Sequence, residues 1–529
     1  MSTRLGLTLP LLVASLILPV IFAYAQTDEA PKSDEYLLLG SANRGAGEPI
    51  IFVNPKDPNN IIVVAMATLN RLPTGETPIP RGQGGFQQGI SPERRQLRIK
   101  ELSTPDGSRT DIAVTRDGGK SWSFSEDNFR KYFSKNRCSD SFSGAGPDGT
   151  LYMGCLAYLN RGTADYDENG YAPNGEAAIY HGGSAIAWST DKGKTWSNPV
   201  WVHPALSPQL YAPTVHPVFE QASPWDRPFF VADASTGTIY VSGSGPAYTV
   251  DPKTVERPKK DPSKPGMGYT GYPPASVSRR RTFLRASHDN GKTWGVIYPV
   301  DSDEYPGAGG GFAAANGKLI VAYTAMKVPE SENAECPCTV LGTSTDDGKT
   351  FKYTVVPPLP KKPGDEAERG GRGGGGFGGV MLSADPSKEG RYAIARSSGN
   401  RIMVSVTEDG GKTWSAPVVA AEVPAGAHFG HRAMKYSPKG DLGLIWKAMY
   451  QNGSFDVWSA VSRDGGHNFK TVRVSHEVSS PCNPERCNFL FGDDLSSVDL
   501  DNQFLHVVWG DNRAGFLGTW YGRVPLSAY

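Results

Sequence analysis

One short motif recurs six times along this chain and constrains the fold more than any other feature of the sequence. Each copy places a serine or threonine two residues before an aspartate, a glycine two residues after it, and an aromatic residue at the end. The aspartate can accept hydrogen bonds from backbone N–H groups, and the glycine can adopt the positive φ of a tight turn. The aspartates are Asp117, Asp191, Asp289, Asp346, Asp409 and Asp464. Because each motif follows an apolar run, we expect six hairpin tips in a fold of repeated antiparallel sheets.

These motifs resemble Asp boxes, the bacterial neuraminidase repeats of a β-propeller superfamily that includes the sialidases. The resemblance covers nearly the whole chain beyond its first residues. It implies that the six boxes are structural and lie on the outer rim of a propeller. Because a fold does not determine a function, the candidate site has to be argued from other residues.

A second repeat lies between the boxes and predicts the number of blades. Each unit is a polar or glycine-rich start, an apolar strand, a turn and a second apolar strand. The seven units begin at Gly47, Ser139, Asp226, Gly310, Gly378, His431 and Asp493. Six units precede a box, and the seventh precedes an apolar run over 517–526 that can supply a third strand. We predict an all-β propeller of seven four-stranded antiparallel blades, closed by the N-terminal strand Glu35–Ala42; six blades, as in sialidases, are the alternative.

The first residues have the pattern of an export signal. Arg4 gives a basic start, an apolar stretch runs over residues 5–22, and Ala23-Tyr24-Ala25 forms a cleavage site. We therefore expect a signal peptide over residues 1–25 and a propeller domain over 26–529. The protein would be secreted or periplasmic, without a membrane segment after cleavage.

Charge and composition exclude some classes of partner. The 54 basic and 54 acidic residues balance, so no net charge attracts nucleic acid or an anionic membrane. The chain has 62 glycines and 42 prolines but is 38% hydrophobic, which favours a turn-rich all-β protein over a disordered one. We expect a monomer that takes a glycan as substrate or ligand. No cofactor is expected, although a structural or site divalent cation such as calcium is compatible with the sequence.

Six cysteines in a chain with an export signal favour disulfides. We predict two pairs, Cys138–Cys155 across a strand–turn–strand unit and Cys482–Cys487 across a short loop. The other two, Cys336 and Cys338, would close a tight ring, and the sequence leaves their pairing open. A metal site is the alternative, but the chain lacks the C-x-x-C spacing that structural zinc commonly uses.

The first residues of the innermost strands are the candidate site, because these strands converge on one end of the central channel of a propeller. Charged residues are unusually dense there, and buried charges are unfavourable unless they are paired or used. We predict Glu48, Asp140 and Asp226 as catalytic residues, and Arg227, His431, Arg432, Asp493 and Arg513 as substrate-binding residues. A structural ring of ion pairs that lines a wet channel is the alternative.

Paired carboxylates can act as general acid and base at a glycosidic bond, and arginines can hold an anionic sugar. The sequence therefore favours a glycoside hydrolase similar to sialidases. It departs from sialidases at Ala46-Gly47-Glu48-Pro49, where their first blade carries an arginine in a [F/Y]-R-I-P signature. A non-catalytic propeller that binds glycan or protein is one alternative. A polysaccharide lyase acting on uronates is another, in which a histidine, such as His428 or His431, and a tyrosine share the proton transfer.

Overall fold

The computed structural model describes residues 33–69, 109–129, 132, 136–159, 181–204, 210–213, 215–217, 226–250, 278–360, 379–480 and 495–529. The predicted signal peptide, Asp493 and the pair Cys482–Cys487 lie outside the described residues. The chain divides into two units, Met1–Ala30 and Pro31–Tyr529, and every described residue belongs to the second. No helix in the described part has the length and apolar character needed to cross a membrane.

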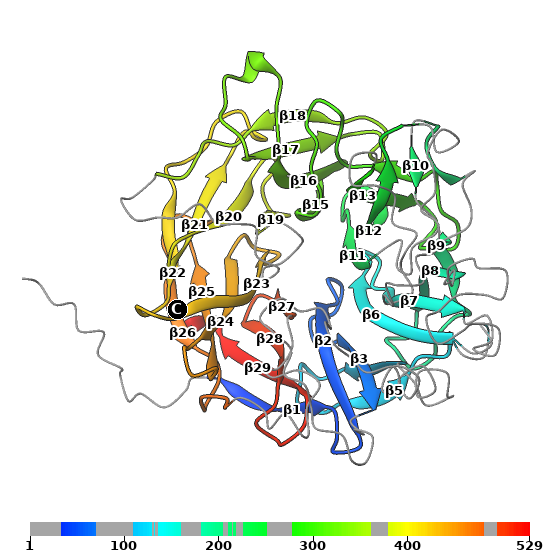
Figure 1. Ribbon diagram of the computed structural model, residues 1–529. Coiled ribbons are helices and arrows are strands. Elements are labelled where there is room, and N and C mark those ends of the chain that lie inside the picture. The colour runs from blue at the N-terminus through cyan, green and yellow to red at the C-terminus, as the bar shows by residue number, and fades with distance from the viewer. Residues whose placement is uncertain are drawn as a thin grey trace, which may run out of the picture. The chain divides into compact units, whose positions relative to one another are not determined.

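Seven antiparallel sheets, the blades, make up the described part of this unit, and they follow one another around the ring in chain order (Figure 1). Blade 1 is β2 (Arg44–Val53), β3 (Ile61–Leu69), β4 (Arg109–Thr115) and β5 (Ser123–Glu126). Blade 2 is β6 (Asn136–Ala145), β7 (Leu151–Leu159), β8 (His181–Ser189) and β9 (Val200–Pro204). Blade 3 is β11 (Asp226–Ala232), β12 (Ile239–Tyr248), β13 (Ser278–Ser287) and β14 (Tyr298–Pro299), with β10 (His216–Pro217) also paired to β12.

The remaining four blades complete the ring. Blade 4 is β15 (Gly311–Ala315), β16 (Lys318–Ala325), β17 (Cys338–Ser344) and β18 (Lys352–Val355). Blade 5 is β19 (Met381–Ala384), β20 (Tyr392–Ser398), β21 (Arg401–Thr407) and β22 (Val418–Glu422). Blade 6 is β23 (His428–Tyr436), β24 (Leu442–Met449), β25 (Phe455–Ser462) and β26 (Lys470–Arg473). Blade 7 is β27 (Ser496–Leu500), β28 (Phe504–Asp511), β29 (Gly518–Pro525) and β1 (Asp34–Leu39). The described residues also form two short 3-10 turns, Glu330–Glu332 and Leu526–Ala528.

The predicted seven blades and the predicted closure are both confirmed. The innermost strands β2, β6, β11, β15, β19, β23 and β27 contact one another in succession, and β27 contacts β2. β1 pairs with β29, from Asp34 opposite Arg523 to Leu39 opposite Thr519. Trp122 donates its indole N–H to the hydroxyl of Tyr36 over 2.7 Å, so the closing strand is also fastened to blade 1. Closure therefore joins the first described strand of the chain to the last blade.

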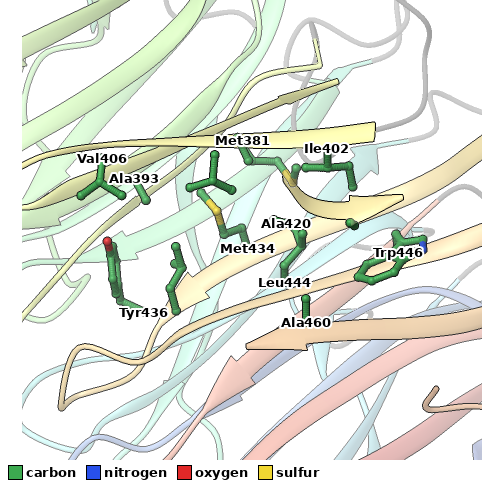
Figure 2. Packing of buried hydrophobic residues seen from close by; sticks show 14 of the residues in the cluster. Met381, Ala393, Ile402, Val406, Ala420, Met434, Tyr436, Leu444, Trp446 and Ala460 are labelled. Atoms are coloured by element: carbon green, nitrogen blue, oxygen red, sulfur yellow. The ribbon is translucent and has the colours of Figure 1, made fainter. Parts of the chain in front are cut away.

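The apolar core lies in layers between neighbouring blades. Figure 2 shows the layer between blades 5 and 6, where Met381 and Ile402 face Met434, Leu444 and Trp446. All five side chains are at least nine-tenths buried. Each blade therefore stabilises its neighbours by burying one face of apolar side chains against them.

All six boxes have the turn structure predicted for them. In the box of blade 2, the Asp191 carboxylate accepts the Ser189 hydroxyl over 2.7 Å, the Thr195 N–H over 2.9 Å and the Thr195 hydroxyl over 2.6 Å. Gly193 has φ 76°, as predicted, and Lys192 before it also has a positive φ of 61°. The turn thus uses two successive left-handed residues, of which only the second has to be glycine in this chain.

The boxes also hold neighbouring blades together. A Cβ added at Gly193 would lie 2.8 Å from a methyl carbon of Val114 in blade 1. The equivalent glycines Gly348, Gly411 and Gly466 approach Leu284, Leu341 and Val406 of the preceding blade in the same way. The second glycine is therefore required by close packing as well as by its φ.

The boxes lie at the opposite end of the blades from the candidate site. In blade 1, Val53 at the end of β2 pairs with Ile61, which pairs with Thr115 at the start of the box. Arg44 at the start of β2 pairs with Leu69 at the far end of β3. Because every blade is antiparallel, the third strand ends where the innermost strand ends. The boxes are thus separated from the first residues of the innermost strands by the length of a strand.

We expect Asp191→Ala to lower the free energy of unfolding by about 1 kcal/mol, because it removes four hydrogen bonds, including one from the Lys194 N–H, for which solvent can partly substitute. Desolvation opposes the shift, but hydrogen bonds from Thr195 and Ser189 lower the pKa of Asp191 below its usual range. A depressed folded-state pKa gives stability that is present above about pH 4 and is lost on acidification. Thermal unfolding of both proteins should therefore show a smaller difference at pH 3 than at pH 7, because the contribution is fully lost only below the folded-state pKa. Thr190→Ala, in the same exposed turn, is the matched control; unchanged stability in Asp191→Ala would contradict the structural role.

The predicted disulfide Cys138–Cys155 is present and joins β6 to β7. Cys336 and Cys338, whose pairing the sequence left open, are also joined, across a cis bond between Cys336 and Pro337. No cysteine is free among the residues that the structure describes.

Candidate functional site

A β-bulge recurs in the innermost strands of the first three blades. The pairing of three consecutive innermost strands with their second strands is interrupted between Gly47 and Ile50 in β2, Ser139 and Phe142 in β6, and Asp226 and Phe229 in β11. In each bulge one charged residue is left-handed: Glu48 has φ 51°, Asp140 has φ 43° and Arg227 has φ 55°. Each stands two residues before the point at which regular pairing resumes.

The next two blades have glycine at the equivalent position. Gly309, with φ 78°, stands two residues before the first paired residue of β15, and Gly379, with φ 76°, does the same before β19. A left-handed conformation is unfavourable for residues with a side chain, by about 1 kcal/mol. In blades 1 to 3 the backbone is therefore strained at this position, where a charged residue stands in place of the glycine that would relieve the strain.

The carboxyl groups from blades 1 to 3 converge at these bulges. The pKa of Asp140 is raised to about 6, first by burial and second by the negative charge of Asp226. Arg227, the hydroxyl of Ser139 and a hydrogen bond with the Glu48 side chain act in the opposite direction. The structure therefore brings together all three predicted catalytic residues, together with Arg227.

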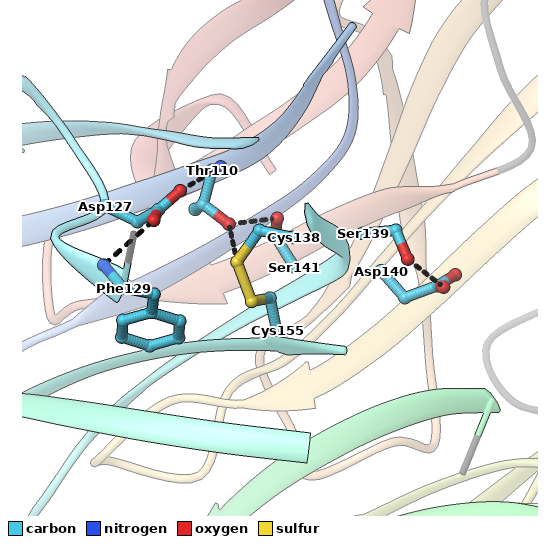
Figure 3. Close-up of a disulfide and its surroundings, with 8 residues drawn as sticks. All are labelled: Thr110, Asp127, Phe129, Cys138, Ser139, Asp140, Ser141 and Cys155. Carbon is cyan, nitrogen blue, oxygen red and sulfur yellow. Dashed lines mark hydrogen bonds between the residues drawn. A yellow bond between two sulfur atoms is a disulfide. The ribbon is translucent and has the colours of Figure 1, made fainter. Parts of the chain in front are cut away.

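The bulge at Asp140 is fastened on both sides (Figure 3). The disulfide Cys138–Cys155 lies two residues before it, and the Ser141 hydroxyl next to it lies 2.7 Å from the Thr110 hydroxyl of blade 1. The Ser139 hydroxyl donates to the Asp140 carboxylate over 3.2 Å. Covalent and hydrogen-bonded support of this kind holds a carboxyl group in a fixed orientation.

Sequence reasoning missed one charged residue of this site, Arg280 on β13. Its guanidinium forms an ion pair of 2.6 Å with Asp226, and its side chain is 39% exposed. It is the middle residue of three consecutive arginines, of which Arg279 and Arg281 pair instead with Asp301. Because side chains alternate along a strand, the middle arginine faces the opposite way. This alternation was the available signal. We call Glu48, Asp140, Asp226, Arg227 and Arg280 the mouth cluster.

His431 and Arg432 lie in blade 6, outside the mouth cluster. The Nδ1 atom of His431 accepts the backbone N–H of Ser496 over 2.8 Å. A backbone N–H can only donate, so a neutral His431 carries its proton on Nε2. His431 thereby links β23 to the start of β27. Arg432 is 4% exposed, and its guanidinium lies 6.0 Å from the centre of the Phe429 ring.

Arg513 is engaged within blade 7. Its guanidinium pairs with Asp511 over 3.0 Å and with Glu35 of the closing strand, and it lies 3.9 Å from the centre of the Trp520 ring. Asp511 is fully buried and also accepts the Ser479 hydroxyl over 2.5 Å. The structure therefore places this predicted substrate-binding residue in a network that ties β28 to β1.

The described residues contain no group of three or more histidine, cysteine, aspartate or glutamate side chains arranged to hold a metal ion. A divalent cation at the site stays a prediction from the sequence.

No family model matches this sequence, and no curated protein matches it. Among solved structures, a protein of unknown function from Dyadobacter fermentans is 13% identical with a TM-score of 0.43, over 93% of this chain and 99% of that one. A Trypanosoma rangeli sialidase in complex with 2,3-difluorosialic acid is 12% identical with a TM-score of 0.37, over 94% of this chain and 59% of that one. NanB sialidase from Streptococcus pneumoniae is 10% identical with a TM-score of 0.39, over 94% and 99%. At these values the fold rests on the sheet topology, and the site has to be argued from its own residues.

Proposed function

We propose that this protein is a glycoside hydrolase whose active site is the mouth cluster. The observation that carries the proposal is the left-handed conformation of Glu48, Asp140 and Arg227 at one register in three adjacent blades. Backbone strain that recurs at one register in adjacent blades is typical of active sites and ligand-binding sites. Export through residues 1–25, a monomeric state and a glycan ligand belong to the same proposal.

The roles within the cluster follow from its electrostatics. Asp140, with its pKa raised to about 6, is a carboxylic acid that can protonate the glycosidic oxygen as the bond to the leaving group breaks. Asp226, which pairs with Arg280 over 2.6 Å, is the base that removes a proton from the water that attacks the anomeric carbon. Arg227 acts electrostatically on Asp140 and holds a polar or anionic substituent of the sugar.

A substrate screen tests the proposal. The purified protein is incubated with sialosides, uronate-containing polysaccharides and arabinans, and products are followed as reducing sugar and as ultraviolet absorbance. Reducing ends without absorbance support the hydrolase. Absorbing, unsaturated products would assign the lyase alternative, and glycan binding without turnover would assign a binding propeller.

The pH profile of kcat/KM tests the role of Asp140. The acid must be protonated in the free enzyme, so activity should fall about tenfold per pH unit above pH 6. The sign follows from the raised pKa, because the protonated form is the active one and is lost as pH rises. Asp140→Asn should remove this alkaline limb together with most of the activity, whereas Thr190→Ala at the distant box should leave the profile unchanged. A profile with no limb between pH 5 and 7 would contradict the assignment.

A further inference from the structure

We propose that Arg280 is a positioning residue, which fixes the Asp226 carboxylate beside Asp140 and offsets the negative charge that this carboxylate exerts on Asp140. Its consequence for catalysis rests on the proposed function, but the arrangement of charges does not.

The geometry of Arg280 supports this role. One nitrogen of its guanidinium, Nη2, lies 2.6 Å from an Asp226 carboxylate oxygen and 3.4 Å from the carbonyl oxygen of Ser244. Ser244 pairs with Asp226 across β11 and β12, so both partners belong to one rung of the sheet. The Arg280 guanidinium thus donates both to the backbone carbonyl of Ser244 and to the Asp226 carboxylate, which fixes the carboxylate relative to the sheet.

Asp140 and Asp226 have different partners. Asp140 is faced by Glu48 from β2, by Asp226 and Arg227 from β11, and by Ser139 of its own strand. The ion pair with Arg280 belongs to Asp226. A carboxylate that forms a short ion pair is a poorer proton acceptor than a neighbour that is mainly desolvated, so the negative charge resides on Asp226, where Arg280 offsets it.

The test is the titration of Asp140 in protein labelled with ¹³C at aspartate carboxyl carbons, with the signal assigned by its loss in Asp140→Asn. The midpoint expected in the wild type is near pH 6. In Arg280→Met the negative charge of Asp226 acts on Asp140 without the cation that pairs with it, so the midpoint should rise by about one pH unit. Arg280→Lys retains the charge and should restore most of the wild-type midpoint.

The neighbouring residue offers a matched control. Arg279→Met removes the same guanidinium one residue away, but Arg279 pairs with Asp301 over 3.1 Å and Asp303 over 2.9 Å on the other face of β13. It should leave the Asp140 midpoint unchanged. Should Arg280→Met not fold, Asp226→Asn gives an independent reading, because removing that negative charge should lower the midpoint.

Two outcomes would overturn the proposal. One is a midpoint in Arg280→Met that is unchanged or lower, and the other is an equal shift in Arg279→Met. The readout needs no turnover, so it remains decisive if no glycan is cleaved and the proposed function fails. Conversely, an active enzyme whose Asp140 titration ignores Arg280 would keep the proposed function and discard the positioning role.

Discussion

Asp140→Gly is expected to abolish catalysis while raising the free energy of unfolding by about 1 kcal/mol. Glycine relieves the left-handed strain at φ 43°. The substitution also removes a carboxyl group that is unfavourable to ionise, because it is buried and lies near the negative charge of Asp226. Turnover should fall at least about 100-fold, because the general acid is lost. Chemical denaturation and initial rates on the best substrate of the screen measure the two effects in one preparation.

Asp140→Ala is the matched variant for this experiment. It lacks the carboxyl group as the glycine variant does, but it keeps a Cβ in the left-handed conformation, so it should be about 1 kcal/mol less stable than Asp140→Gly. The opposite pattern, with both variants destabilised and turnover preserved, would mean that Asp140 belongs to a structural ring of ion pairs.

Removing the closing strand is expected to destabilise the protein by about 5 kcal/mol or more. Leu38 and Leu39 are each 7% exposed, and burial of such side chains contributes about 2 kcal/mol each, to which the pairing of β1 with β29 and the Glu35–Arg513 ion pair add. A loss of this size is comparable with the whole stability of many proteins. Thermal unfolding with light scattering should show early unfolding and aggregation of a chain that begins at Ser41.

A chain that begins at Ser33 keeps the strand and is the control, which should unfold at the temperature of the full-length protein. A synthetic peptide of residues 33–42 should restore part of the lost stability of the shorter chain, and a scrambled peptide should not. Equal unfolding temperatures for the two truncated chains would show that β1 contributes little to closing the ring.

The sequence predicted the fold well, because the features that define it are local. Each box needs only its aspartate, hydroxyl residue and glycine to form a turn, and the number of strand–turn–strand units gave the number of blades. Closure by the first strand followed because the last unit had no fourth strand of its own. The convergence of Glu48, Asp140 and Asp226 followed from their places near the starts of successive units.

The finer features of the site depend on contacts that no local pattern encodes. Nothing in the sequence distinguishes the left-handed Asp140 from an ordinary strand residue. Arg280 lies on a third strand, outside the positions that the unit pattern singled out. The side chain of Arg513 could have pointed to the channel or towards β1, and only the closing of the ring, which brings Glu35 to it, decides between them.

The pairing of Asp34 with Arg523 sets the order in which this protein can fold. Synthesis proceeds from the N-terminus, so β1 is made first, while its partner β29 is made last. The six blades between them each form from contiguous residues and can fold as they appear, with short loops to close. The apolar run Leu37–Leu39 stays unpaired until β29 has been synthesised. During that interval the same strand that later seals the ring is an open edge able to pair with another nascent chain, so the yield of folded protein should depend on protein concentration during refolding.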